Sequence, residues 1–224
     1  MKKILIFTPS FFPNIGGVEK HVLETSLILQ RNKFDTTIVT VGEKVNCKAR
    51  EATLGYKNSS KKELRSSLKI NRFSYPKIRF FGLLIIWWQI FRKYYYLIRD
   101  ADVIHIHDVF VWYLPFRFLF WRKPVITTFH GWEGIFPVPM KNKLWRKLGV
   151  LLSTKTIAVG KYLEKYYGFS ADIIIYGGVH VPRQVFSKEN ILLYVGRLDY
   201  DTGFPLLLQS LKQQPWSGKV IFCG

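Results

Sequence analysis

The sequence has 224 residues, 48% of them hydrophobic, and a formal net charge of +19. A chain of this length holds one large domain, or one domain and part of a second, and it buries a core without help from a disulfide or a metal. The two cysteines, Cys47 and Cys223, have a spacing that fits no metal site or redox pair, which favours a reducing compartment. The positive charge predicts a polyanionic partner, such as nucleic acid, anionic lipid or a phosphorylated metabolite.

The chain begins with a short apolar run, KKILIFT, which is predicted as a strand because no signal-peptide cleavage pattern follows it. We therefore expect a cytoplasmic protein. Similar Val/Ile-rich runs recur and alternate with stretches of helical spacing, which is typical of an α/β fold with a parallel sheet covered on both faces. The predicted strands are residues 2–8, 35–41, 70–75, 102–107, 124–129, 155–159, 172–176, 191–196 and 219–224.

A glycine pair, Gly16-Gly17, follows the first strand and opens a helix predicted over residues 17–30. Glycine lets the backbone approach a ligand closely, and the start of a helix offers free N–H groups to a phosphate. The pair is neither a dinucleotide-binding fingerprint nor a Walker motif. Taken alone, it predicts either a phosphate-handling loop or a simple tight turn.

Residues 79–99, RFFGLLIIWWQIFRKYYYLIR, are rich in aromatic side chains. Polar residues within the run argue against a membrane-spanning helix. The run is predicted either as a helix packed on the sheet or as an interfacial helix, whose Trp and Tyr lie at the lipid headgroups while Arg and Lys contact anionic lipid. The residues predicted to contact the membrane are Trp87, Trp88, Arg92 and Lys93.

The charge of the surrounding segment favours the membrane reading. Residues 44–99 hold 14 lysines and arginines against two glutamates, which gives a net charge of +12. Aromatic residues among basic ones also suit single-stranded nucleic acid, but the sequence carries no known nucleic-acid-binding motif. An anionic membrane surface is therefore predicted as a partner, and nucleic acid is not.

Two strand ends in mid-chain carry histidines. In DVIHIHD, His105 and His107 lie on the same side of a strand and are predicted as structural, whereas Asp108 ends the strand and is a candidate for facing a cleft. In TFHG, His130 follows the next strand. It is predicted either as an active-site group or as a hydrogen-bonded histidine at a strand end.

A domain boundary is predicted late in the chain. Helical spacing occurs at residues 141–153 and 159–168, and a linker composition of glycine, proline and polar residues follows at 178–190. We expect a first domain over residues 1–182 and a second over 183–224. The second segment has the pattern of a strand, a glycine loop, a helix and a strand, which is too little to bury a separate core, so an incomplete second domain is expected.

Four motifs occur in a fixed order: PNIGGVE after the first strand, DVIHIHD and TFHG in mid-chain, and YVGRLDYDTGFPLLLQSL after the linker. Together they resemble the retaining, nucleotide-sugar-dependent glycosyltransferases of family 4, over nearly the whole chain. The resemblance implies a GT-B architecture of two Rossmann-like domains that face each other across a cleft. This sequence would supply the acceptor-side domain and the start of the donor-binding domain.

The resemblance also implies roles for single residues. His130 matches the family's active-site histidine, and Gly16 and Gly17 match the loop that approaches the acceptor or the donor phosphate. Glu19, at the helix start, either contacts a substrate or interacts with the helix dipole. Arg197 matches the arginine that holds the donor diphosphate through a bidentate fork.

The sequence departs from the family pattern in its last part. Thr202 stands before Gly203 where the family usually has a lysine, so this position offers the diphosphate a hydrogen bond but no charge. The linker reads YGGVH where PNGVD is common. The E-x7-E pair that contacts the donor in the family has no counterpart up to Gly224.

The function implied by the resemblance is sugar transfer from a nucleotide-diphosphate sugar to the hydroxyl of a lipid-linked or membrane-associated acceptor, as in cell-envelope glycan or glycolipid synthesis. Neither a metal nor a permanently bound cofactor is expected. The predicted location is peripheral, at the inner face of the cell membrane. Two alternatives stay open: a non-catalytic membrane- or acceptor-binding subunit whose partner chain supplies the C-terminal half, and an inactive truncated remnant.

Overall fold

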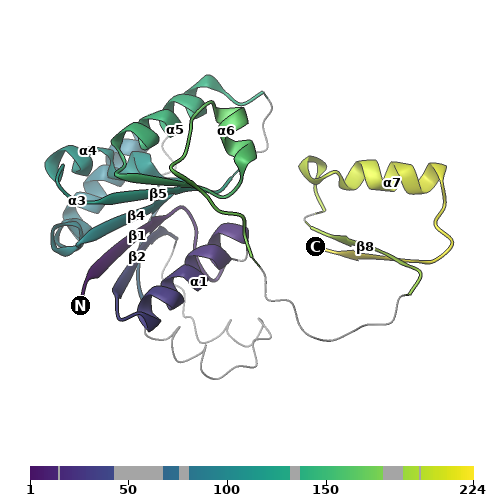
Figure 1. Ribbon diagram of the computed structural model, residues 1–224, viewed down its shortest axis with the longest axis horizontal. Helices are drawn as coiled ribbons and strands as arrows, with labels where there is room; N and C mark the ends of the chain where they lie inside the picture. The colour runs from purple at the N-terminus through teal and green to yellow at the C-terminus, as the bar shows by residue number, and fades with distance from the viewer. Residues whose placement is uncertain (15, 43–67, 76–80, 132–136, 179–188, 197) are drawn as a thin grey trace. The chain divides into compact units, whose positions relative to one another are not determined.

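The computed structural model of the chain describes residues 1–14, 16–42, 68–75, 81–131, 137–178, 189–196 and 198–224 (Figure 1). The chain divides into two compact units, Met1–Gly177 and Gly178–Gly224. Each unit is described by itself below. The candidate site lies in the first unit.

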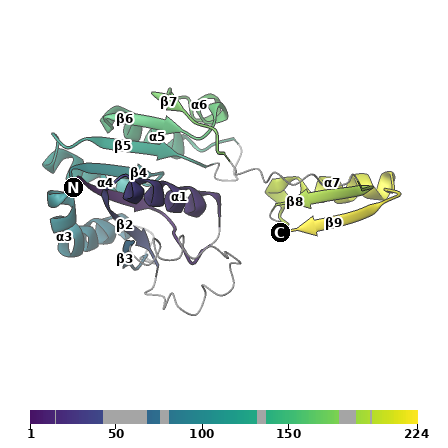
Figure 2. The same ribbon diagram turned by 60° about the horizontal axis from the view of Figure 1, so that its bottom comes forward.

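The first unit is built on a seven-stranded sheet in the order β3-β2-β1-β4-β5-β6-β7, in which every neighbouring pair is parallel. Figure 2 labels β3, β2, β4, β5, β6 and β7, which follow one another in this order from the bottom of the sheet to its top. The sequence prediction of these strands is confirmed. The strands are β1 (Lys3–Thr8), β2 (Asp35–Val41), β3 (Lys69–Phe73), β4 (Val103–His107), β5 (Val125–Phe129), β6 (Lys155–Ala158) and β7 (Ile173–Ile174).

Helices connect the strands wherever the structure describes the connection. The helices expected from spacing are present as α1, α3, α5 and α6, whereas α4 was not predicted. Gly168 ends α6 in the left-handed conformation, at φ 66°, as the sequence suggested. The helices are α1 (Gly17–Arg31), α3 (Gly82–Asp100), α4 (Phe110–Leu119), α5 (Met140–Leu152) and α6 (Lys161–Tyr167).

Strand β1 shows how the sheet is covered on both faces. Its alternate side chains point to opposite sides, so Leu5 and Phe7 pack in one cluster with residues of α3 and α4. Ile4 and Ile6 pack on the other side with residues of α1. Strands buried on both faces favour apolar residues on both sides, which is why the middle of β1 is a continuous apolar run.

The strand order reverses direction between β1 and β4. From β1 the chain passes to β2 and β3 on one side, whereas β4 lies on the other side of β1 and is followed by β5, β6 and β7. Open parallel sheets bind ligands outside the carboxyl ends of the strands at such a switch point. The topology therefore directs attention to the segments that follow β1, β4 and β5.

The second unit contains the parallel pair β8 (Ile191–Val195) and β9 (Lys219–Cys223), the short helix η3 (Tyr200–Thr202) and helix α7 (Phe204–Gln213). This matches the predicted order of strand, glycine loop, helix and strand. Among the described residues of this unit none is buried. Its inner contacts include the aromatic rings of Tyr194, Phe204 and Phe222.

Candidate functional site

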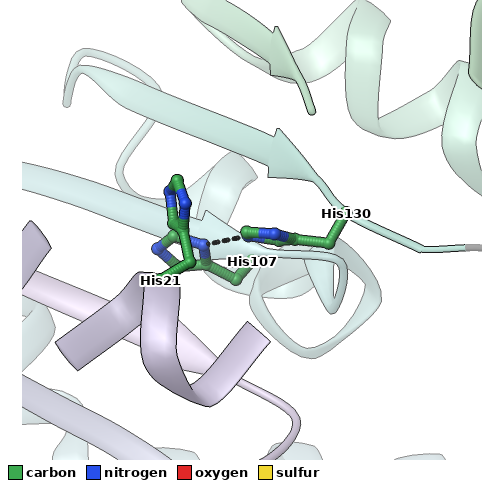
Figure 3. A group of neighbouring side chains, drawn as sticks. All are labelled: His21, His107 and His130. Carbon is green, nitrogen blue, oxygen red and sulfur yellow. Dashed lines mark hydrogen bonds between the residues drawn. The ribbon is translucent and has the colours of Figure 1, made fainter. Parts of the chain in front are cut away.

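Three segments meet at the carboxyl ends of the central strands: the start of α1 after β1, and the residues that follow β4 and β5. They bring together His21 from α1, His107 at the end of β4 and His130 after β5 (Figure 3). Each histidine offers a ring nitrogen, and the three nitrogens lie within 4.8 Å of one another. We call these three residues the histidine cluster.

A hydrogen bond joins two members of the histidine cluster, His107 Nδ1 and His130 Nε2, at 2.7 Å (Figure 3). His107 Nε2 is buried without a hydrogen-bond partner among the described residues. A proton on this Nε2 would be a buried, unsatisfied donor, so His107 carries its proton on Nδ1 and donates it to His130. His130 therefore holds its own proton on Nδ1.

The third member, His21, lies against the ring of His130 in an edge-to-face arrangement, with ring centroids 4.7 Å apart. His107 stacks on His130 at 5.0 Å. The sequence analysis did not single out His21. One signal was available: His21 lies in the first turns of a helix that begins just after β1, and this places it at the same sheet edge as the ends of β4 and β5.

Burial lowers the pKa of every histidine in this region. It brings the pKa of His130 to about 4, against a partial opposing effect of Asp108, and that of His105 to about 4. Burial also places the pKa of His107 well below its ordinary value and lowers the pKa of His21. These rings are therefore neutral at pH 7, and each offers one lone pair and one N–H group.

Asp108 fixes the position of His130. Its backbone has a positive φ of 59°, a conformation that Asp tolerates better than most residues. One carboxylate oxygen, Oδ1, accepts hydrogen bonds from the backbone N–H of His130 at 3.0 Å and from Arg146 Nη1 at 2.8 Å. The Tyr162 hydroxyl donates to the carbonyl of His130 at 3.2 Å. The prediction of Asp108 as a candidate for facing a cleft did not include this anchoring role.

Arg146 is a second residue that the sequence analysis did not find. This arginine of α5 is buried, pairs with Asp108 and donates from Nη2 to the carbonyl of Gly131 at 3.0 Å. Its guanidinium lies over the ring of Tyr167, 4.2 Å from the centroid. In the sequence it is one of several basic residues on a helix, and only the packing of the fold distinguishes it.

The glycine pair at the start of α1 has two different roles. A side chain at Gly16 would collide with the Glu19 carboxylate, which lies against the Gly16 backbone, whereas a side chain at Gly17 would meet no other side chain among the described residues within 4 Å. Gly16 is extended, at φ −171°, and among the described residues no side chain forms a capping hydrogen bond with α1. Gly16 therefore gives Glu19 room.

Two predicted donor-binding residues belong to the second unit. Arg197 lies outside the residues that the structure describes. The Thr202 hydroxyl donates to the carbonyl of Asp199 at 2.7 Å and accepts from the Tyr194 hydroxyl at 2.9 Å. These internal hydrogen bonds already occupy the group that was predicted to contact the diphosphate.

The predicted membrane residues all lie on α3, but they face different ways. Trp87 is half-buried and donates from its indole to the carbonyl of Val111 in α4 at 2.8 Å. Trp88, Arg92 and Lys93 are exposed, and the guanidinium of Arg92 lies 5.2 Å from the Trp88 ring centroid. Among the described helices, none is long and apolar enough to cross a bilayer.

Other apolar side chains extend this surface. Leu84, Trp88 and Phe91 share one side of α3, and more than half of each side chain is exposed. The ring of Tyr95 contacts Phe91 at 5.3 Å and Phe120, at the end of α4, at 5.6 Å. We call these five residues the aromatic face.

Comparison with known proteins gives a family match. Residues 15–181 match the model of Glycosyltransferase Family 4. A curated relative from Xanthomonas campestris, named GDP-mannose:cellobiosyl-diphosphopolyprenol alpha-mannosyltransferase, is 25% identical over 94% of the chain. The chain spans 56% of the length of that protein.

Two solved structures resemble the chain. A glycosyltransferase from Rickettsia africae has a TM-score of 0.62 at 18% identity, and the Anabaena protein HepE, solved with UDP and glucose, has a TM-score of 0.64 at 16% identity. Each likeness covers 99% of this chain and 60% of the other. These likenesses confirm the predicted α/β fold class.

Proposed function

Because this chain belongs to glycosyltransferase family 4 and has a GT-B type of fold, we propose that it takes part in sugar transfer from a nucleotide-diphosphate sugar to an acceptor hydroxyl. The observation that carries the proposal is the position of Asp108 and His130, joined by a hydrogen bond, at the switch point of the sheet and within the matched residues. The names of the relatives support both substrates. One names a GDP-mannose donor with a diphosphate-linked lipid acceptor, and another was solved with UDP and glucose.

The proposed chemistry breaks the bond between the sugar's anomeric carbon and the diphosphate oxygen and forms a bond to the acceptor oxygen with the same configuration. The proton of the acceptor hydroxyl leaves with the diphosphate. Electrostatic stabilisation of that leaving group would come from Arg197 and from helix N–H groups. Neutral His130, with its proton on Nδ1, would hold a hydroxyl of the sugar or acceptor by a hydrogen bond.

The acceptor is proposed to be lipid-linked, and the chain to work at the inner face of the cell membrane. The aromatic face on α3 and α4 supports this proposal, since exposed Trp and Phe beside Arg92 and Lys93 have the composition of an interfacial surface. Trp87 is assigned to packing against α4, because its indole is already bonded there.

Transfer activity is tested with the purified chain, UDP- or GDP-sugars and a polyprenyl-diphosphate lipid bearing a short glycan, with glycolipid product and free nucleotide as readouts. We expect His130→Ala to lower product formation at least about a hundredfold, in the range of a lost acid–base or polar catalytic group. Arg31→Ala, at the opposite end of α1, is the control and should match the unchanged chain. Equal activity of His130→Ala and the unchanged chain would contradict the role of His130.

A non-catalytic acceptor-binding subunit is the second candidate. It is favoured by the Thr202 hydroxyl, which is engaged by Asp199 and Tyr194 instead of being open to a diphosphate. In this case the chain binds the acceptor lipid, forms no product alone and gains activity only with a partner chain that binds the donor. Failure to bind either the nucleotide sugar or the acceptor lipid would remove both candidates and favour an inactive remnant.

Membrane binding is tested by flotation with neutral phosphatidylcholine vesicles and with vesicles that also contain phosphatidylglycerol. We expect the chain to bind the anionic vesicles, and added salt to weaken the binding. Trp88→Ala should weaken it about tenfold, because burial of a large apolar side chain contributes about 1.5–3 kcal/mol.

Trp87→Phe is the matched control for flotation. Trp87 is next to Trp88 in the sequence, but its ring faces α4, so this variant should bind vesicles like the unchanged chain. Absence of binding to both kinds of vesicle would refute the membrane proposal, as would equal binding by Trp88→Ala and the unchanged chain.

A further inference from the structure

We propose that the histidine cluster, His21, His107 and His130, is a binding site for a divalent transition-metal ion of the Zn²⁺ class. The inference concerns binding alone and goes beyond sugar transfer, on which it does not depend. It rests on the convergence of three imidazoles from α1, β4 and the segment after β5 (Figure 3).

The spacing of the ring nitrogens fits this ion after a small adjustment. Zinc–nitrogen bonds of about 2.0–2.1 Å in tetrahedral geometry place two ligand nitrogens about 3.3 Å apart. In the cluster, His107 and His130 present nitrogens 2.7 Å apart, and all three ligand atoms lie within 4.8 Å. His21 is half-buried on a helix surface, so its ring can turn to close the longer distance.

The hydrogen bond within the cluster marks the place where an ion would bind. Imidazole binds a metal through a ring nitrogen that carries no proton. An ion between His107 Nδ1 and His130 Nε2 would take the place of the proton that those atoms share. That proton would move to Nε2 of His107, which is buried without a hydrogen-bond partner among the described residues, so the metal–nitrogen bonds have to outweigh one unsatisfied buried donor.

The surroundings hold the ligands in place. Asp108 binds the backbone N–H of His130 and Tyr162 binds its carbonyl. Fixed outer partners of this kind orient ligands and preserve metal affinity.

The donor set selects the metal. Three imidazoles suit Zn²⁺, Co²⁺, Ni²⁺ and Cu²⁺, whereas Mg²⁺ and Ca²⁺ prefer oxygen ligands. A three-histidine set leaves a fourth position open.

The test uses the full chain without a polyhistidine tag, freed of metal by a chelator and titrated with Co²⁺ as a spectroscopic probe. We expect one Co²⁺ per chain, with the visible absorption of a tetrahedral nitrogen-ligated ion, displaced by Zn²⁺ and unaffected by Mg²⁺. Thermal unfolding provides the second readout, because an ion that binds the folded state raises the melting temperature. Zn²⁺ should raise it and Mg²⁺ should not.

Two variants locate the site. His21→Ala removes the ligand on the helix and should weaken Co²⁺ binding at least about tenfold. Mutating an outer partner of a metal ligand already lowers metal affinity about 10–100-fold, so losing a ligand should cost no less. His105→Gln is the matched control, since His105 touches His107 but stands outside the cluster, and it should bind Co²⁺ like the unchanged chain. Melting without metal checks that both variants are folded.

The proposal would be overturned if folded His21→Ala bound Co²⁺ with unchanged affinity. It would also be overturned if His105→Gln lost the Co²⁺ spectrum to the same extent as His21→Ala. Absence of a tetrahedral Co²⁺ spectrum in the unchanged chain would also overturn it. These outcomes are independent of glycolipid formation, so failure of the metal site and failure of the proposed function are distinguishable.

Discussion

Asp108 is a residue on which the order of the candidate site depends. Its carboxylate joins the His130 backbone to the Arg146 guanidinium, and both charged side chains are largely shielded from water, with 17% and 8% of their side-chain surface exposed. Removing one partner of such a pair leaves the other as an uncompensated buried charge. The site is therefore linked to the stability of the fold through a single side chain.

We expect Asp108→Ala to lower the free energy of unfolding by about 3–5 kcal/mol, the usual effect of breaking a buried ion pair. Asp108→Asn should lower it by less, because asparagine still accepts the His130 N–H and tolerates a positive φ. Urea denaturation measures both. Asp100→Ala, which removes an exposed partner of Arg99, is the control and should change stability much less. Equal losses for the alanine and asparagine variants at position 108 would contradict this account.

At the residue scale, the sequence predicted the site in part. Gly16, Glu19 and His130 were singled out because they follow predicted strands and lie in motifs that resemble a known family, and Asp108 because it ends a predicted strand. His21 and Arg146 were not, since both lie within helices, where position in the sequence does not reveal which side chains reach a distant strand end. Their roles arise from tertiary packing, which a single sequence does not record. Whether the recognised residues act in catalysis or binding stays a prediction.

At the scale of elements, the strands were predictable for a physical reason. A parallel strand covered on both faces is a continuous run of Val, Ile and Leu, and such runs are conspicuous between polar segments. Helix α4 lacked such a signal. Its sequence, FVWYLPFRFL, is apolar on all sides and contains Pro115, so neither helical periodicity nor propensity marks it.

The edge of the sheet depends on Asp172, which precedes β7. Its carboxylate accepts hydrogen bonds from the Thr156 backbone N–H at 2.8 Å, the Thr156 hydroxyl at 2.7 Å and Lys155 at 3.0 Å. These bonds lower the pKa of Asp172 to about 2. A carboxylate with a lowered pKa stabilises the fold above its ordinary pKa of 3.8, and this contribution is lost as the pH falls toward 2.

We therefore expect Asp172→Asn to be less stable than the unchanged chain at pH 7, by a difference that shrinks between pH 4 and pH 2. Urea denaturation across this range provides the measurement. Asp35→Asn is a suitable comparison, since Asp35 forms an exposed ion pair with Lys69 at the opposite side of the sheet. A stability difference for Asp172→Asn that stays constant down to pH 2 would show that the carboxylate is not the cause.

At the scale of the whole molecule, the two units differ in how much apolar surface they bury. The first unit contains three clusters of buried hydrophobic residues, whereas the described residues of the second include none that is buried. Small units with little buried surface are only marginally stable. The linker composition predicted a boundary in this part of the chain, because glycine, proline and polar residues interrupt the alternation of strands and helices, and the predicted bounds of the two domains stay a prediction.

We expect hydrogen exchange of the full chain to show this difference. Backbone amides of β1, β4 and β5 should exchange at least about tenfold more slowly than those of α7, β8 and β9, because local opening of the second unit exposes little apolar surface. The amides of α3 serve as an internal reference for a helix packed on a core. Protection of α7 equal to that of α3 would contradict the expectation.

The reversal of strand order between β1 and β4 also has a consequence for biosynthesis. One edge of β1 pairs with β2 soon after synthesis, but the other waits for β4, whose first residue follows Thr8 by 95 positions. At about 5–20 residues per second, the ribosome needs roughly 5–20 s to make this segment. Throughout that interval an apolar strand edge stays open to pairing with other chains, which is a condition that favours aggregation. His21 likewise meets His107 and His130 only when most of the first unit has been made.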